Sequence, residues 1–226
     1  MKNGEITTAP KGGERRWMAK SLRMKSKNTL WVLLCATCFA LHSSLFISCS
    51  ETDDVEADDF ANWQTRNDAF FASLEDSLTM SPEASQWEKI KNYTLNDDFV
   101  SPATDYIYVK KLETSNSIYS PLYTDTVRVA YQGRIMPSAA FPQGRVFEQT
   151  FVGTFSWRTT SAASGVASSF VMGFTTALLH MHRGDRWRVY IPYQLGYNAT
   201  AKTNIPAYST LIFDLALVDL WHPVNK

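Results

Sequence analysis

Apolar and polar residues follow two different spacings along this chain of 226 residues. Between Phe60 and Leu78, apolar side chains recur every three or four residues, which predicts an amphipathic helix. From Tyr106 onward, apolar and polar residues mostly alternate, which is typical of half-buried strands. The pattern therefore predicts an N-terminal helical segment at residues 60–100 and a strand-rich domain at residues 101–226.

A second helix is predicted within the N-terminal segment. It would begin at the Ser-Pro-Glu sequence of residues 81–83, because proline is common at the first helical position. Trp87, Ile90 and Tyr93 would form its apolar face. We expect this two-helix segment to pack on the strand-rich domain, and dimerisation through the helices is the alternative.

The strand-rich domain also contains one clear helix, predicted at residues 173–184. Gly184 is a good stop signal, and the apolar face would consist of Phe174, Ala177, Leu178 and Met181. Residues 156–169 are rich in Ser, Thr and Ala and are expected to form a loop. The predicted strands are residues 106–113, 126–133, 145–151, 185–191 and 210–220. Several strands with one short helix predict an α+β fold.

Basic residues are concentrated at the start of the chain. Of 22 basic and 22 acidic side chains, eight basic and two acidic ones lie in residues 1–49, which leaves 14 basic and 20 acidic ones and a net charge of −6 in residues 50–226. That charge argues against nucleic acid as the main partner. The basic stretch at residues 15–27 precedes an apolar stretch at residues 30–47, the order found in a secretory signal. A signal that begins at Met24 would be more typical than one that begins at Met1.

All three cysteines lie in the first 49 residues. Cys35 and Cys38 have the Cys-x-x-C spacing, but they lie within the apolar stretch and not at the exposed helix start of a redox pair. Residues 46–49, Phe-Ile-Ser-Cys, resemble a bacterial lipobox. The resemblance implies a lipoprotein signal peptide at residues 1–49, lipid attachment at Cys49 and an acidic tether at residues 50–59. An ordinary signal peptide or membrane anchor is the alternative.

Residues 127–221 resemble the FKBP-type peptidyl-prolyl cis-trans isomerases. The segments that carry the resemblance occur in the family's order: VRVAYQG, VFEQTF, GFTTALLHMHRGDRWRVYIPYQLGY and IPAYSTLIFDLALVDL. The chain also resembles the lipoprotein members of this family from Bacteroidetes. The family fold is a twisted antiparallel sheet wrapped around one short helix, which agrees with the order of elements predicted above.

The resemblance implies a pocket between the helix and the sheet that needs neither a cofactor nor a metal. Phe174 would be its floor, and Tyr197 would offer its hydroxyl to a substrate carbonyl. A backbone N–H near Val171 would bind the same peptide. The expected pocket residues are Tyr131, Phe147, Glu148, Phe170, Val171, Phe174, Tyr197, Ile205 and Phe213. Considered without the family order, most of these residues are typical of an ordinary hydrophobic core.

Three positions depart from the family pattern. Phe174 stands where Trp is frequent, Glu148 where Asp is usual, and Asn198 where Gly is usual. Asn tolerates a positive φ better than most residues, so the turn at residue 198 is expected to survive. The loops at residues 137–144 and 156–169 are longer than expected and border the pocket.

Some residues suggest other chemistry. His180 and His182 would suggest a metal site, but one intervening residue places them on different sides of a helix. Asp185 and Asp214 are interpreted as structural, with Asp214 near the rim of the pocket. A further pocket position is expected to be filled by Phe155 or Trp157.

The sequence therefore predicts an isomerase anchored by lipid in the bacterial cell envelope, where it would assist the folding of exported proteins. Its partners would be proline-containing polypeptides. One alternative is a non-catalytic chaperone or protein-binding lipoprotein with an FKBP fold. The other is a structural surface lipoprotein with a vestigial pocket.

Overall fold

The computed structural model describes residues 59–96, 98 and 100–222. The chain divides into residues 1–49 and residues 50–226, and every described residue belongs to the second of these units. The predicted signal peptide, Cys49 and nearly all of the acidic tether lie outside the described residues. In the described part of the chain, no helix is both long and apolar enough to cross a membrane.

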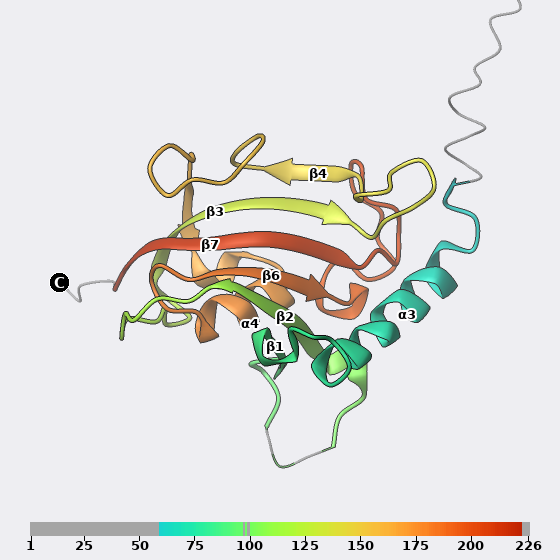
Figure 1. Ribbon diagram of the computed structural model, residues 1–226, viewed down its shortest axis with the longest axis horizontal. Helices are drawn as coiled ribbons and strands as arrows, with labels where there is room; N and C mark the ends of the chain where they lie inside the picture. The colour runs from blue at the N-terminus through green and yellow to red at the C-terminus, as the bar shows by residue number, and fades with distance from the viewer. Residues whose placement is uncertain (1–58, 97, 99, 223–226) are drawn as a thin grey trace, which may run out of the picture. The chain divides into compact units, whose positions relative to one another are not determined.

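The described residues form an antiparallel sheet with α-helices beside it (Figure 1). The helices are α3 (Trp63–Ser73) and α4 (Met172–His180). The strands are β1 (Trp87–Lys91), β2 (Tyr106–Glu113), β3 (Thr126–Ile135), β4 (Val146–Gln149), β5 (Ala163–Val166), β6 (Arg186–Ile191) and β7 (Leu211–Trp221). Short 3₁₀ helices cover Leu74–Leu78, Ala84–Gln86, Ala103–Asp105, Ala167–Ser169 and Tyr193–Leu195. The strand order is β1-β2-β6-β7-β3-β4, and β5 also pairs with β3.

The hydrophobic core lies between α4 and the sheet face that the alternating pattern predicted. The buried members of that face include Val127, Val129, Tyr131, Trp187, Val189, Ile191, Leu211, Phe213, Leu215 and Leu217. Within each strand they occupy every second position, because successive strand residues point to opposite faces of a sheet. The predicted strands at residues 106–113, 126–133, 185–191 and 210–220 are confirmed as β2, β3, β6 and β7, and the one at residues 145–151 is confirmed in part as β4.

Helix α4 packs closely against the sheet. A Cβ atom placed on Gly173 would lie 2.3 Å from Cγ2 of Ile191, so glycine permits this approach. The predicted apolar face is buried, since Phe174, Ala177, Leu178 and Met181 are each at most 2% exposed. The predicted end at Gly184 is wrong. The backbone of Met181 is already extended, and Gly184, with φ of +96°, lies in the turn before β6.

Helix α3 confirms the first helix of the N-terminal segment and its packing on the strand-rich domain. Its buried residues are Trp63, Asn67 and Phe71. The Trp63 Nε1–H donates to Oγ of Ser209 at 2.8 Å, and the side-chain oxygen of Asn67 accepts from the backbone N–H of Thr210 at 2.7 Å. These bonds join the helix to the segment that leads into β7.

The second predicted helix is wrong, because its apolar residues lie on strand β1. β1 pairs antiparallel with β2, from Trp87 opposite Lys110 to Lys91 opposite Tyr106. The ring of Trp87 stacks on Tyr190 at 5.4 Å. The free edge of β2 offers backbone partners that override the helical spacing. Residues 60–100 are therefore not wholly helical, and the sheet extends across the expected domain boundary at residue 101.

The predicted loop at residues 156–169 is also more structured than expected. Its second half forms β5, which pairs with β3 from Thr126 opposite Val166 to Val129 opposite Ala163. A 3₁₀ turn then leads to Phe170 and α4. The missing apolar alternation has a physical reason, since most of β5 is exposed.

Candidate active site

An aromatic cavity of about 360 Å³ lies between α4 and the inner face of the sheet. Its lining residues are Tyr131, Glu148, Ser169, Phe170, Val171, Phe174, Tyr197 and Phe213. The structure therefore brings together seven of the nine predicted pocket residues. They come from β3, β4, β7, the segment before α4, α4 itself and the loop after β6.

Phe174 forms the floor of the aromatic cavity. It is 2% exposed, and three aromatic rings surround it. Phe170 stacks on it at 4.6 Å, Phe213 meets it nearly edge-on at 4.9 Å, and Tyr131 meets it edge-on at 5.7 Å. Edge-to-face and offset stacked pairs are the favourable arrangements of aromatic rings. The floor is thus a rigid apolar surface.

Two predicted pocket residues support the cavity from outside its lining. Phe147 packs edge-on behind Phe213, with 5.6 Å between ring centroids. Both rings lie over Gly133, where an added Cβ would be 2.7 Å from each of them. Ile205 is 5% exposed and belongs to the hydrophobic core. Both were predicted as pocket residues, but neither lines the aromatic cavity.

Ser169 lines the cavity although the sequence did not single it out. It ends the 3₁₀ turn immediately before Phe170, and its hydroxyl donates to the backbone oxygen of Val166 at 2.7 Å. A lone serine in a stretch rich in small polar residues carries no periodic signal. Its contribution depends on the turn that precedes α4, which the sequence did not predict.

Two tyrosine hydroxyls differ in their hydrogen bonding. The Tyr131 hydroxyl donates to Oε1 of Glu148 at 2.7 Å. The Tyr197 hydroxyl has no hydrogen-bond partner among residues 59–96, 98 and 100–222. Burial, followed by the hydrogen bond and charge of Glu148, raises the pKa of Tyr131, and burial with the Glu148 charge raises the pKa of Tyr197. Both phenols therefore stay neutral at ordinary pH, and Tyr197 is the one with a free donor.

The loop that carries Tyr197 is held by a compact set of backbone bonds. The N–H of Asn198 donates to the oxygen of Tyr193 at 2.8 Å, and the N–H of Tyr208 donates to the oxygen of Asn198 at 2.9 Å. Asn198 has φ of +54°, so the turn survives the departure from glycine as predicted. The bonds from α3 to Ser209 and Thr210 fix the far end of the same loop.

Several candidates lie away from the aromatic cavity. Asp185 accepts the backbone N–H groups of Ser115 and His182, both at 2.7 Å, which is a structural role. Asp214 accepts two hydrogen bonds from the Arg186 guanidinium at 2.8 Å, and it does not line the aromatic cavity.

His180, Phe155 and Trp157 also do not line the aromatic cavity. Nδ1 of His180 lies 2.8 Å from the backbone oxygen of Thr176. In the part of the chain that the structure describes, no group of three or more His, Cys, Asp or Glu side chains is placed to hold a metal. Phe155 and Trp157 line a different cavity, so the prediction that one of them fills the aromatic pocket is wrong.

The comparisons with known proteins agree with this geometry. Residues 120–218 match the family described as FKBP-type peptidyl-prolyl cis-trans isomerase. The chain is 27% identical over 183 residues to the macrophage infectivity potentiator of Trypanosoma cruzi, covering 80% of this chain and 81% of that protein. It is 31% identical over 106 residues to the FKBP-type 22 kDa peptidyl-prolyl cis-trans isomerase of Escherichia coli K12, covering 44% and 43% of the two chains.

Two solved structures share the fold. The peptidyl-prolyl cis-trans isomerase from Pseudomonas syringae pv. tomato has a TM-score of 0.50 and 22% identity, covering 72% of this chain and 96% of that one. FkpA from Escherichia coli has a TM-score of 0.50 and 19% identity, covering 87% and 83%. The match over residues 120–218 and these relatives thus support an FKBP-type peptidyl-prolyl cis-trans isomerase domain in this chain. The predicted α+β fold and enzyme class are confirmed.

Proposed function

We propose that the aromatic cavity is where this enzyme accelerates rotation about X-Pro bonds in polypeptides. One observation carries the proposal: an apolar floor, Phe174 with the rings around it, lies beside the free hydroxyl of Tyr197. A proline ring is apolar and fits such a floor. The residue before it brings a carbonyl group that needs a hydrogen-bond donor.

The chemistry requires no nucleophile. Rotation about an X-Pro bond disrupts amide resonance, with a barrier of about 18–20 kcal/mol, and takes roughly tens to hundreds of seconds unaided. The twisted amide is less polar than the planar one. An apolar site therefore disfavours the planar ground state more than the twisted state, and this difference accelerates the reaction.

Two donors would orient the substrate. Tyr197 would donate to a substrate carbonyl, and its neutral phenol is preserved because burial raises its pKa. The backbone N–H of Val171 lies at the start of α4, where N–H groups lack partners within the helix. Tyr131 would act differently, since its hydroxyl already donates to Glu148.

NMR exchange on a short X-Pro peptide tests this proposal. The wild-type protein should accelerate cis-trans exchange, and Val171→Trp should abolish the acceleration because the larger side chain fills the cavity. Tyr197→Phe should weaken it by about tenfold, the effect of one lost hydrogen bond that acts mainly in the transition state. Phe155→Ala, outside the aromatic cavity, is the matched control. Unchanged exchange in folded Val171→Trp would refute the proposed site.

A folded wild-type protein that binds proline peptides without accelerating exchange would instead support a non-catalytic binding module. Neither binding nor acceleration would support a structural lipoprotein with a vestigial pocket.

We further propose that the protein is exported, anchored by lipid at Cys49 and active on exported polypeptides in the cell envelope. The basic and apolar stretches and the Phe-Ile-Ser-Cys sequence support this location. Labelling with a radioactive fatty acid should mark the wild type in a bacterial host and leave Cys49→Ser unlabelled. Equal labelling of both would rule out attachment at Cys49.

A further inference from the structure

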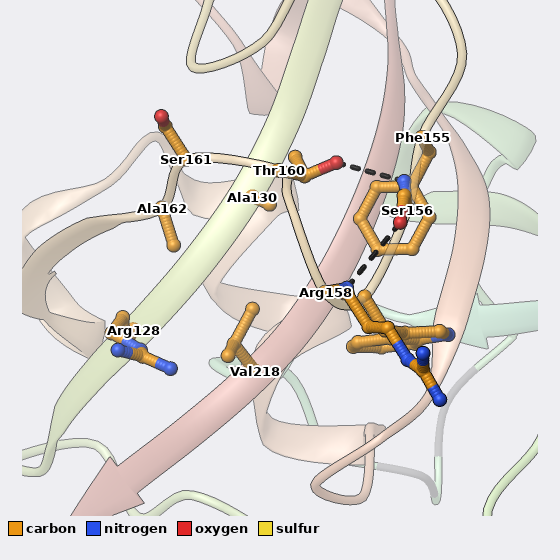
Figure 2. Close-up of a pocket in the computed structure, with 10 residues that line it drawn as sticks. Arg128, Ala130, Phe155, Ser156, Arg158, Thr160, Ser161, Ala162 and Val218 are labelled. Atoms are coloured by element: carbon orange, nitrogen blue, oxygen red, sulfur yellow. Dashed lines mark hydrogen bonds between the residues drawn. The ribbon is translucent and has the colours of Figure 1, made fainter.

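A second cavity, of about 420 Å³, opens on the outer face of the sheet. Its lining residues are Arg128, Ala130, Phe155, Ser156, Trp157, Arg158, Thr160, Ser161, Ala162 and Val218 (Figure 2). We call it the arginine cavity. Ala130 and Tyr131 are consecutive residues of β3, so the arginine cavity and the aromatic cavity lie on opposite faces of this strand.

The aromatic wall of the arginine cavity is fixed in place. The Arg186 guanidinium lies over the Phe155 ring, 4.6 Å from its centroid. The Trp157 indole N–H donates to Glu113 at 2.7 Å, and Arg186 also pairs with Glu113 at 3.1 Å. Phe155 and Trp157 meet edge-on at 4.9 Å. These contacts hold the loop against the sheet, so the wall is preformed.

Hydroxyl groups of the same loop are available as donors. Oγ1 of Thr160 accepts the backbone N–H of Ser156 at 2.8 Å, and Oγ of Ser156 accepts the backbone N–H of Arg158 at 3.4 Å (Figure 2). A hydroxyl that accepts from a backbone N–H keeps its own hydrogen for another acceptor. Both groups can thus donate to an anion.

The arginine cavity is cationic and has no acidic lining residue. Within the described residues, the guanidinium groups of Arg128 and Arg158 form no ion pair. Asp219 lies opposite Arg128 in the register of β3 and β7, but its ion pair is with Arg183, at 3.6 Å. Two arginines that form no ion pair thus line a cavity, in a unit whose sequence carries more acidic than basic side chains. The Arg158 side chain extends away from the other lining residues, so it would have to turn toward a ligand (Figure 2).

We propose that the arginine cavity binds an acidic segment of a polypeptide through its carboxylates. Guanidinium groups bind carboxylates in a bidentate geometry, and the two hydroxyls supply further donors. The floor residues Ala130 and Val218, with the ring of Phe155, provide apolar surface beside these donors (Figure 2). The cavity is larger than one carboxylate needs, so it fits an acidic side chain together with an apolar neighbour.

A binding titration tests the proposal without reference to catalysis. The probe is a blocked pentapeptide of alternating glutamate and leucine, added to the isotope-labelled protein and followed by NMR. Signals of the Trp157 indole and of the Ser156 and Thr160 amides should shift, and the affinity should fall as salt is added. The same peptide with glutamine in place of glutamate should not bind.

Variants locate the site. Arg128→Gln combined with Arg158→Gln should weaken binding at least about tenfold, as expected for lost hydrogen bonds between charged groups. Arg134→Gln, which removes the same charge from the same strand outside the cavity, should leave binding unchanged. Both substituted arginines are exposed, so the fold should persist, and an unchanged melting temperature checks this.

Three results would overturn the proposal: no shifts at these residues, equal binding by the double variant, or acetate or phosphate binding as tightly as the peptide. The last result would identify a site for small anions only. Exchange of a neutral X-Pro peptide should be the same in the double variant and the wild type. Failure of the acidic-peptide proposal can therefore be distinguished from failure of the isomerase proposal.

Discussion

Two cavities of similar size occupy opposite faces of β3, and they differ in almost every chemical respect. The aromatic cavity has about 360 Å³ and contains four aromatic rings in or beside its floor. The arginine cavity has about 420 Å³, and its lining includes two arginines and three hydroxyl-bearing residues. One strand serves both, because its alternate side chains face different environments.

The two cavities are built from different parts of the chain. The rings of the aromatic cavity come largely from β3, α4 and β7, whose residues also form the hydrophobic core. The wall of the arginine cavity comes from the loop between β4 and β5, which a cation–π contact and a hydrogen bond hold against the sheet. A change in the first should therefore affect both stability and isomerisation. A change in the wall of the arginine cavity should affect binding of the acidic peptide, with little effect on stability or isomerisation.

Phe213→Ala should have the largest effect. Phe213 is 5% exposed and contacts Tyr131, Phe147 and Phe174, so its loss should lower the free energy of unfolding by about 3–5 kcal/mol. Isomerisation should fall at least about tenfold, since one wall of the aromatic cavity is removed. Urea denaturation and NMR exchange would measure the two effects.

Phe155→Ala is the matched control on the other face. Phe155 is only partly buried, so it should destabilise the protein less than Phe213→Ala and leave exchange of a neutral peptide unchanged. Equal losses of isomerisation in the two variants would contradict the assignment of the two cavities to different functions.

Gly133→Ala should have the next largest effect. The added Cβ would lie 2.7 Å from the rings of Phe147 and Phe213, and such overpacking typically destabilises by about 1–3 kcal/mol. Isomerisation should fall as well, because the rings must move. At Gly165 the nearest atom to an added Cβ is the Phe170 ring at 3.3 Å, so Gly165→Ala should be the milder change. Thermal unfolding would measure both variants, and a lower melting temperature for Gly165→Ala than for Gly133→Ala would contradict this prediction.

Much of the aromatic cavity was predictable because two signals coincide there. Alternation placed Tyr131 and Phe213 on the inner face of their strands, and helical spacing placed Phe174 on the buried face of α4. The family order then identified Phe170 and Tyr197, which no periodic pattern marks. Phe147 and Ile205 show the limit of this reasoning, because an apolar residue near a pocket can either line it or support it.

Strand β1 and the arginine cavity could not be predicted from the sequence, because both depend on contacts between residues far apart in the chain. Trp87 and Ile90 have helical spacing, yet they form an edge strand because β2 offers free backbone groups. The arginine cavity joins residues of β3, β7 and a loop without periodicity. Nothing local to Arg128 indicates that Arg158 lies at the same cavity, since only the fold brings them together.

Trp63→Phe should have a smaller effect. It removes the hydrogen bond from the Trp63 indole to Ser209, and one lost hydrogen bond typically lowers the free energy of unfolding by about 0.5–1.5 kcal/mol. Because Ser209 ends the loop that carries Tyr197, isomerisation should decline slightly. Trp221→Phe, at a residue 48% exposed, is the control and should leave both unchanged. Urea denaturation of the two variants would check this, and equal stability would contradict a role for α3 in holding the loop.

A change of pH between about 6 and about 10 should have the smallest effect on isomerisation. Burial and the charge of Glu148 raise the pKa values of Tyr131 and Tyr197 above the ordinary value of 10.0. A raised pKa means that the fold favours the neutral phenol, so its contribution is complete below about pH 10 and is lost only as the pH rises through the raised value. Isomerisation of a neutral peptide should therefore be constant from about pH 6 to about pH 10, as NMR exchange would measure.

The arginine cavity should respond to acid instead. Guanidinium groups stay charged throughout this range, whereas the glutamates of an acidic ligand become neutral near their ordinary pKa of about 4.3. Binding of the acidic peptide should thus fall below about pH 5. A loss of isomerisation with a midpoint below pH 10 that Tyr197→Phe removes would contradict the raised pKa of this tyrosine. Binding that does not weaken between about pH 5 and about pH 3 would contradict recognition of the glutamate carboxylates by the arginines.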